Sequence, residues 1–103
     1  MSSALAVSKE NFRKEVLESE NTVLADFWAA WCGPCRMLSP VIDEIAAENS
    51  DIKVVKINVD EQPELAQEFN IMTIPSLLVF KNGELVNQSA GVKPKPLILQ
   101  MVK

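Results

Sequence analysis

Residues Thr22 to Arg36 read TVLADFWAAWCGPCR, an apolar run followed by a short segment that contains both cysteines of the chain. The run is rich in β-branched and aromatic residues, which favour an interior strand. Cys32 and Cys35 follow it with two residues between them. A disulfide between them closes a very small loop and restricts the unfolded chain little, so it is poorly suited to stabilising a fold. The pair is better suited to opening and closing, which indicates redox chemistry.

The composition limits the classes of function that the chain can serve. It has 103 residues and a formal net charge of −4, with acidic and basic residues interleaved. We expect one domain over residues 1–103 and a monomer, and the mixed charge disfavours nucleic acid as a partner. No apolar stretch approaches the roughly 20 residues that span a bilayer, so no membrane partner is expected. The first residues do not resemble a signal peptide, which favours a cytoplasmic protein, although a processed precursor would look the same.

Hydrophobic periodicity predicts strands and helices that alternate along the chain. The expected strands cover residues 5–7, 22–28, 52–59, 76–81 and 84–90. The expected helices cover residues 8–19, 34–49, a segment that begins at Pro63, and residues 94–102. Three details can be checked in the structure: Ser8 is the expected cap of the first helix, Pro40 is expected to kink the second, and Leu97, Ile98 and Met101 are expected to face inward on the last.

This order of elements predicts an α/β fold. Strands that alternate with helices pair in parallel through right-handed crossovers. Asn82-Gly83 is a strong signal for a tight hairpin, which adds an antiparallel strand at the edge of the sheet. The cysteines then lie at the carboxyl end of one strand and the amino end of a helix, where open α/β sheets place their sites.

Beyond these patterns, the sequence resembles the thioredoxin family. The matching residues are Asp26-Phe27-Trp28-Ala29, Trp31-Cys32-Gly33-Pro34-Cys35-Arg36, Pro40, Lys56, Asp60, Ile74-Pro75, Phe80-Lys81-Asn82-Gly83 and Gly91. A Cys-x-x-Cys motif beside a βαβ pattern is an established signature of this fold. The resemblance implies a central mixed five-stranded sheet flanked by four helices on both faces. It also implies a dithiol protein that reduces disulfides in other proteins.

The positions of the two cysteines suggest a different role for each in the redox reaction. Cys32 stands where a helix begins, so unpaired backbone N–H groups and the helix dipole stabilise its thiolate by about 0.3–1 kcal/mol. It is the candidate nucleophile. Cys35 follows one helical turn later and faces inward, which makes it the candidate resolving thiol that releases the substrate.

Two charged residues occupy strand positions where charge is disfavoured. Asp26 either reaches solvent or a backbone donor, or it lies buried beneath the cysteines, as the resemblance suggests, and exchanges a proton with Cys35. Burial would raise its pKa. Lys56 either tunes Asp26 electrostatically or extends its ammonium to the surface.

The resemblance further implies a surface that binds substrates. In this family a cis proline, here Pro75, faces the cysteines and turns the preceding backbone outward to pair with a substrate strand. The residues expected to form the surface are Trp31, Gly33, Pro34, Thr73, Ile74, Pro75, Gly91 and Val92.

Other classes of function have less support. A zinc or iron–sulfur site needs about four Cys or His ligands, and the chain has two cysteines and no histidine, so no bound cofactor or metal is expected besides the Cys32–Cys35 disulfide itself. A disulfide-forming oxidant and a binding module without turnover stay open as alternatives on the same fold. By resemblance, the expected partners are a thioredoxin reductase, dependent on NADPH or ferredoxin, and diverse disulfide-containing proteins.

Overall fold

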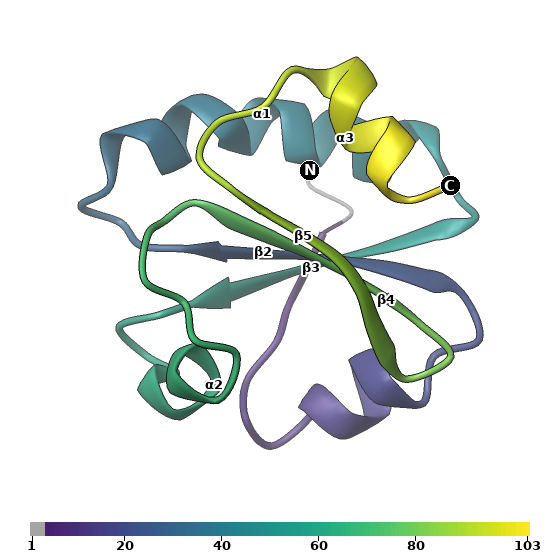
Figure 1. Ribbon diagram of the computed structural model, residues 1–103, viewed down its shortest axis with the longest axis horizontal. Helices are drawn as coiled ribbons and strands as arrows, with labels where there is room; N and C mark the ends of the chain where they lie inside the picture. Colours follow the sequence, from purple (N-terminus) through teal and green to yellow (C-terminus); the bar gives the residue numbers. More distant parts are fainter. Residues whose placement is uncertain (1–3) are drawn as a thin grey trace.

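The computed structural model describes residues 4–103 and contains a five-stranded sheet in the order β1-β3-β2-β4-β5 (Figure 1). The strands are β1 (Leu5–Ala6), β2 (Thr22–Trp28), β3 (Ile52–Asn58), β4 (Ser76–Lys81) and β5 (Glu84–Ala90). The helices are a π-helical segment η1 (Arg13–Leu17), α1 (Gly33–Glu48), α2 (Pro63–Glu68) and α3 (Lys95–Met101). The predicted order of elements and the mixed α/β fold are confirmed.

The central strand β2 is parallel to β3 on one side and antiparallel to β4 on the other. Strand β1 extends the parallel half, and β5 extends the antiparallel half. Asn82 and Gly83 both adopt positive φ angles, 53° and 81°, which the tight turn between β4 and β5 requires. The hairpin predicted from Asn82-Gly83 is therefore present.

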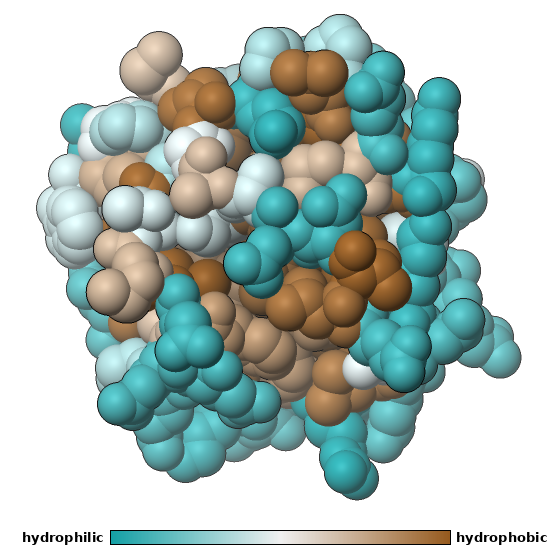
Figure 2. Space-filling model, viewed as in Figure 1, coloured by the Kyte–Doolittle hydropathy of each residue, from teal (hydrophilic) through white to brown (hydrophobic). Residues whose placement is uncertain are grey.

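Helices cover both faces of the sheet, and each face has its own core (Figure 1). Side chains alternate along β2, so Leu24 packs in the core beneath α1 and α3, whereas Ala25 and Phe27 pack in the core beneath η1 and α2. Outside these cores, the side shown in Figure 2 carries apolar groups in small clusters separated by hydrophilic side chains.

Two expectations about the helices were wrong. The first helical segment does not run from residue 8 to residue 19 but covers only Arg13–Leu17. Asn11 is the physical reason for the late start, because its Oδ1 accepts from the backbone N–H of Ser8 and its own N–H donates to the Ser8 carbonyl, which closes a turn ahead of the helix. The N-cap residue is accordingly Phe12 and not Ser8. Leu97 does not face inward but is 45% exposed, whereas Ile98 and Met101 are buried as predicted. Pro40 lies inside α1, at an exposed position.

Candidate functional site

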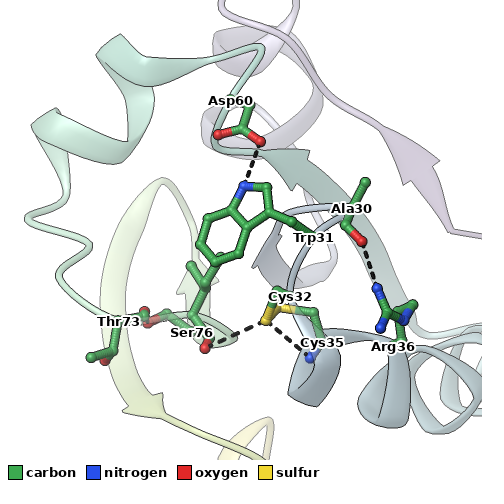
Figure 3. Close-up of a disulfide and its surroundings, with 9 residues drawn as sticks. Ala30, Trp31, Cys32, Cys35, Arg36, Asp60, Thr73 and Ser76 are labelled. Carbon is green, nitrogen blue, oxygen red and sulfur yellow. Dashed lines mark hydrogen bonds between the residues drawn. A yellow bond between two sulfur atoms is a disulfide. The ribbon is translucent and has the colours of Figure 1, made fainter.

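Cys32 is the N-cap residue of α1 and forms a disulfide with Cys35 (Figure 3). The sulfur of Cys32 accepts a hydrogen bond from the backbone N–H of Cys35 at 3.2 Å. This N–H is one of the donors at the helix start that have no partner within the helix. Negative charge on the Cys32 sulfur would be stabilised at the same place.

Solvent exposure does not distinguish the two cysteines. Cys32 is 4% exposed and Cys35 is 3% exposed in the disulfide form. The half-buried side chains of Trp28, Val59 and Ile74 pack against the pair. The sulfur of Cys32 also lies 3.7 Å from the carbonyl oxygen of Ile74. The two sulfurs differ instead in their position relative to the helix start, because Cys32 is the N-cap residue and Cys35 lies within the first turn of α1.

The residues around the disulfide form an open rim. Trp31 is 68% exposed, and its Nε1 donates to the Asp60 carboxylate at 2.8 Å, which turns the indole nitrogen away from Cys32 (Figure 3). Pro34 is exposed in the first turn of α1, and Gly33 is partly exposed. Arg36 donates from its guanidinium to the Ala30 carbonyl at 2.8 Å, which ties the start of α1 to the preceding turn.

The second half of the rim comes from the segment before β4 and the segment after β5. The Ile74–Pro75 peptide bond is cis, as predicted. Pro75 itself is buried, while Thr73 and Val92 are exposed. The Gly91 N–H donates to the Pro75 carbonyl at 2.8 Å, which joins the two segments. Because Pro75 is buried, its side chain offers little contact area, and the exposed surface here comes from neighbours such as Thr73 and Val92.

Asp26 lies beneath the disulfide on the α1 face of the sheet and is 2% exposed. Its register partners on the adjacent strands are Lys56 on β3 and Leu77 on β4. Its Oδ1 is buried and has no hydrogen-bond partner among the described residues. Burial raises the pKa of Asp26 from 3.8 to about 7, although the positive charge of Lys56 opposes this rise. Of the two alternatives for Asp26, the structure has the buried one, and the pKa is shifted in the direction that burial was expected to give.

Asp26 and Cys35 both line a cavity of about 110 Å³. Its lining residues are Asp26, Trp28, Cys35, Arg36, Ser39 and Lys56. A space of this size, with polar groups in its wall, has room for water between the carboxyl and the inner sulfur. The arrangement can therefore pass a proton between Asp26 and Cys35.

Lys56 is held by α1 and does not extend freely into solvent. Its Nζ donates to the Ser39 hydroxyl at 2.8 Å and lies 3.1 Å from a carboxylate oxygen of Asp43. Sequence reasoning missed Ser39 and Asp43. The available signal was that Ser39 follows Cys35 by four residues and Asp43 follows Ser39 by four, because such residues share one face of a helix.

A buried dithiol–disulfide pair at the start of a helix on this mixed sheet defines a redox protein. The thioredoxin family model matches residues 3–103. "Thioredoxin 1" of Synechococcus elongatus is 54% identical over 96 residues, which cover 92% of this chain and 90% of the relative. "Thioredoxin 1" of a Nostoc species is 48% identical over 104 residues, covering 100% of this chain and 97% of the relative.

A relative named "Thioredoxin M-type, chloroplastic", from Chlamydomonas reinhardtii, is 50% identical over 99 residues, covering 95% of this chain and 71% of the relative. The chain belongs to the thioredoxin family and is a disulfide oxidoreductase whose redox group is the Cys32–Cys35 pair of the protein itself. Within residues 4–103, no helix has the length and apolarity needed to cross a membrane. In the same residues, no three His, Cys, Asp or Glu side chains gather in a way that could hold a metal ion.

Proposed function

We propose that this chain works as a protein-disulfide reductase through two exchange steps. The thiolate of Cys32 attacks one sulfur of a substrate disulfide, forms a mixed disulfide and releases the other substrate sulfur as a thiolate. Cys35 then loses its proton and attacks the sulfur of Cys32, which releases the second substrate thiolate and forms the Cys32–Cys35 disulfide. The substrate gains two electrons, and the cysteine pair loses them.

The position of Cys32 at the N-cap of α1 is the observation that supports these roles most strongly. Its sulfur accepts the Cys35 N–H at 3.2 Å and stands at the positive end of the helix dipole. Cys35 lies behind it and lines the cavity that also contains Asp26. We assign Asp26 as the acceptor of the Cys35 proton, and Lys56 as the charge that tunes Asp26.

Replacing one cysteine at a time tests the assignment. In Cys35→Ser the first step proceeds and the second cannot, so a substrate such as insulin should accumulate as a mixed disulfide that denaturing, non-reducing electrophoresis detects. Cys32→Ser is the matched control and should trap nothing. If Cys35→Ser released reduced insulin at the normal rate, or if Cys32→Ser trapped it instead, the roles would be wrong.

We assign substrate docking to the rim around the disulfide. Trp31, Gly33 and Pro34 form one side, and the joined segments before β4 and after β5 form the other. On that second side, the exposed backbone next to Pro75 offers the hydrogen-bonding groups with which an extended substrate segment can pair. Thr73 and Ile74 flank it on the segment before β4, and Gly91 and Val92 lie beside it on the segment after β5.

A reductant must restore the dithiol after each turnover. By family membership, we propose a thioredoxin reductase that takes electrons from NADPH or ferredoxin, diverse disulfide-containing proteins as substrates, and a monomer of one domain in the cytoplasm. An assay that couples NADPH oxidation to insulin reduction, with a ferredoxin-dependent reductase in parallel, separates the two electron sources. A redox titration of the cysteine pair separates a reductant from an oxidant, because an oxidant has a much higher potential.

A further inference from the structure

Ser39 lines the cavity between Asp26 and Cys35, but the reaction described above makes no use of its hydroxyl. We propose that Ser39 is a positioning residue for the exchange reaction: its hydroxyl holds the Lys56 ammonium beside Asp26 and thereby sets the pH range in which Asp26 can accept the Cys35 proton. This inference rests on the proposed function, in which Asp26 takes that proton.

Two side chains of α1 hold Lys56 in place. Its Nζ donates to the Ser39 Oγ at 2.8 Å and lies 3.1 Å from the Asp43 Oδ1. An ammonium has three N–H donors, so both contacts form at once. Ser39 follows Cys35 by one helical turn and lines the cavity, whereas Asp43 lies a further turn along α1, outside the cavity lining. The Ser39 hydroxyl is thus the anchor that keeps the ammonium at the cavity.

The position of this ammonium affects Asp26 because the carboxyl is buried. Lys56 and Asp26 are register partners on adjacent parallel strands, so their side chains leave the same face of the sheet. Charges interact more strongly with a buried carboxyl than they do through bulk water. Without Ser39, the ion pair with Asp43 would draw the ammonium along α1, away from Asp26, and its carboxylate would lose part of its stabilisation.

The other groups around Asp26 show which of them can stabilise its carboxylate. Cys35 and Arg36 line the cavity from α1, and Asp43 on the same helix raises the pKa of Asp26. Leu77, the register partner on β4, is apolar. Glu61, which follows β3, lines a neighbouring pocket together with Lys56. Among these groups, Lys56 is the one whose charge lowers the pKa of Asp26, and Ser39 contacts it directly.

Titration of the oxidised protein by carbon-13 NMR of the Asp26 carboxyl carbon gives a direct test, since the cysteines do not titrate in the disulfide form. Ser39→Ala, which favours the helix, should move the Asp26 midpoint upward by about half a pH unit. Ser39→Thr keeps the hydroxyl and should restore the wild-type midpoint. Ser50→Ala, at an exposed position after α1, is the matched control and should change nothing.

The rate of mixed-disulfide resolution should follow the same shift. In Ser39→Ala, the acidic limb of the pH profile for resolution should move to higher pH by the same amount. At a given pH on that limb, the rate should fall by about two- to threefold. In a Lys56→Met background, Ser39→Ala should have no further effect on the midpoint, because the hydroxyl acts through Lys56.

Three results would overturn the inference: an unchanged Asp26 midpoint in Ser39→Ala, a shift that persists without Lys56, or a midpoint shift that leaves the pH profile of resolution in place. Failure of the proposed function gives a different result. Asp26→Asn would then resolve mixed disulfides with the wild-type pH profile, whereas the NMR midpoints of the Ser39 variants would still report whether Ser39 holds Lys56.

Discussion

The two faces of the sheet are packed in different ways. Beneath η1 and α2, four phenylalanine rings lie 5.4 to 6.2 Å apart between centroids, in an apolar core. Beneath α1, Leu24 and Asp26 of β2 point to the same face of the sheet, and Asp26 lines a cavity. The first face contributes stability at any pH. The second places an ionisable group, Asp26, in an apolar region at a cost in stability, and that group is the proposed acceptor of the Cys35 proton.

Removing a ring from the first face should have the largest effect on stability. Phe80 is 2% exposed and meets Phe12 and Phe69 edge-on. Phe80→Ala should lower the free energy of unfolding by about 3–5 kcal/mol through lost burial and the resulting cavity. Denaturant unfolding at pH 4 and pH 8 should show the same loss at both values. A strongly pH-dependent loss would show that the two faces do not differ as described.

Replacing Asp26 should have a smaller effect of the opposite sign. Below pH 3.8 the carboxyl is neutral in both the folded and the unfolded chain; as the pH rises to about 7 the unfolded chain ionises first, so the wild type loses stability over this range. The shift from 3.8 to about 7 corresponds to roughly 4 kcal/mol at about 1.4 kcal/mol per pKa unit. The buried amide of Asp26→Asn offsets about 1–2 kcal/mol of the gain.

The Asp26→Asn variant should therefore be more stable than the wild type by about 2–3 kcal/mol at pH 8 and should lose this advantage by pH 3. Disulfide reduction near neutral pH should be slower, since the proposed acceptor of the Cys35 proton is gone. Unfolding curves across this pH range and insulin reduction at pH 7 check both outcomes. A variant that is less stable than wild type at pH 8 yet fully active would contradict both.

A substitution in the hairpin turn should have the smallest effect on stability. A Cβ at Gly83 would lie 2.9 Å from the Leu17 carbonyl oxygen, and the residue has a φ of +81°. Gly83→Ala should destabilise the protein by about 1–2 kcal/mol, without pH dependence. Gly91 has a similar φ of +88° but open space around it, so Gly91→Ala should cost less in thermal unfolding. An equal or larger loss at Gly91 would show that the contact with Leu17 is unimportant.

Sequence patterns predicted the fold better than the details of the site. A continuous apolar run rich in β-branched and aromatic residues located β2, and the helical repeat of Leu38, Ile42 and Ile45 located α1, because both patterns reflect burial along one continuous element. The first helix was predicted too long because the turn closed by Asn11 depends on a side-chain hydrogen bond. Leu97 was predicted to face inward because periodicity does not show how much of a short terminal helix is covered.

The sequence by itself determined the order of the elements and the position of Cys32 at the start of α1, since both depend on neighbouring residues. Only the tertiary structure decided that Asp26 has a buried oxygen without a partner and that Lys56 on β3 meets Ser39 and Asp43 on α1. These contacts join side chains on different elements that meet only in the folded protein. Which distant polar groups meet, and how much water they retain, depends on how the helix packs on the sheet.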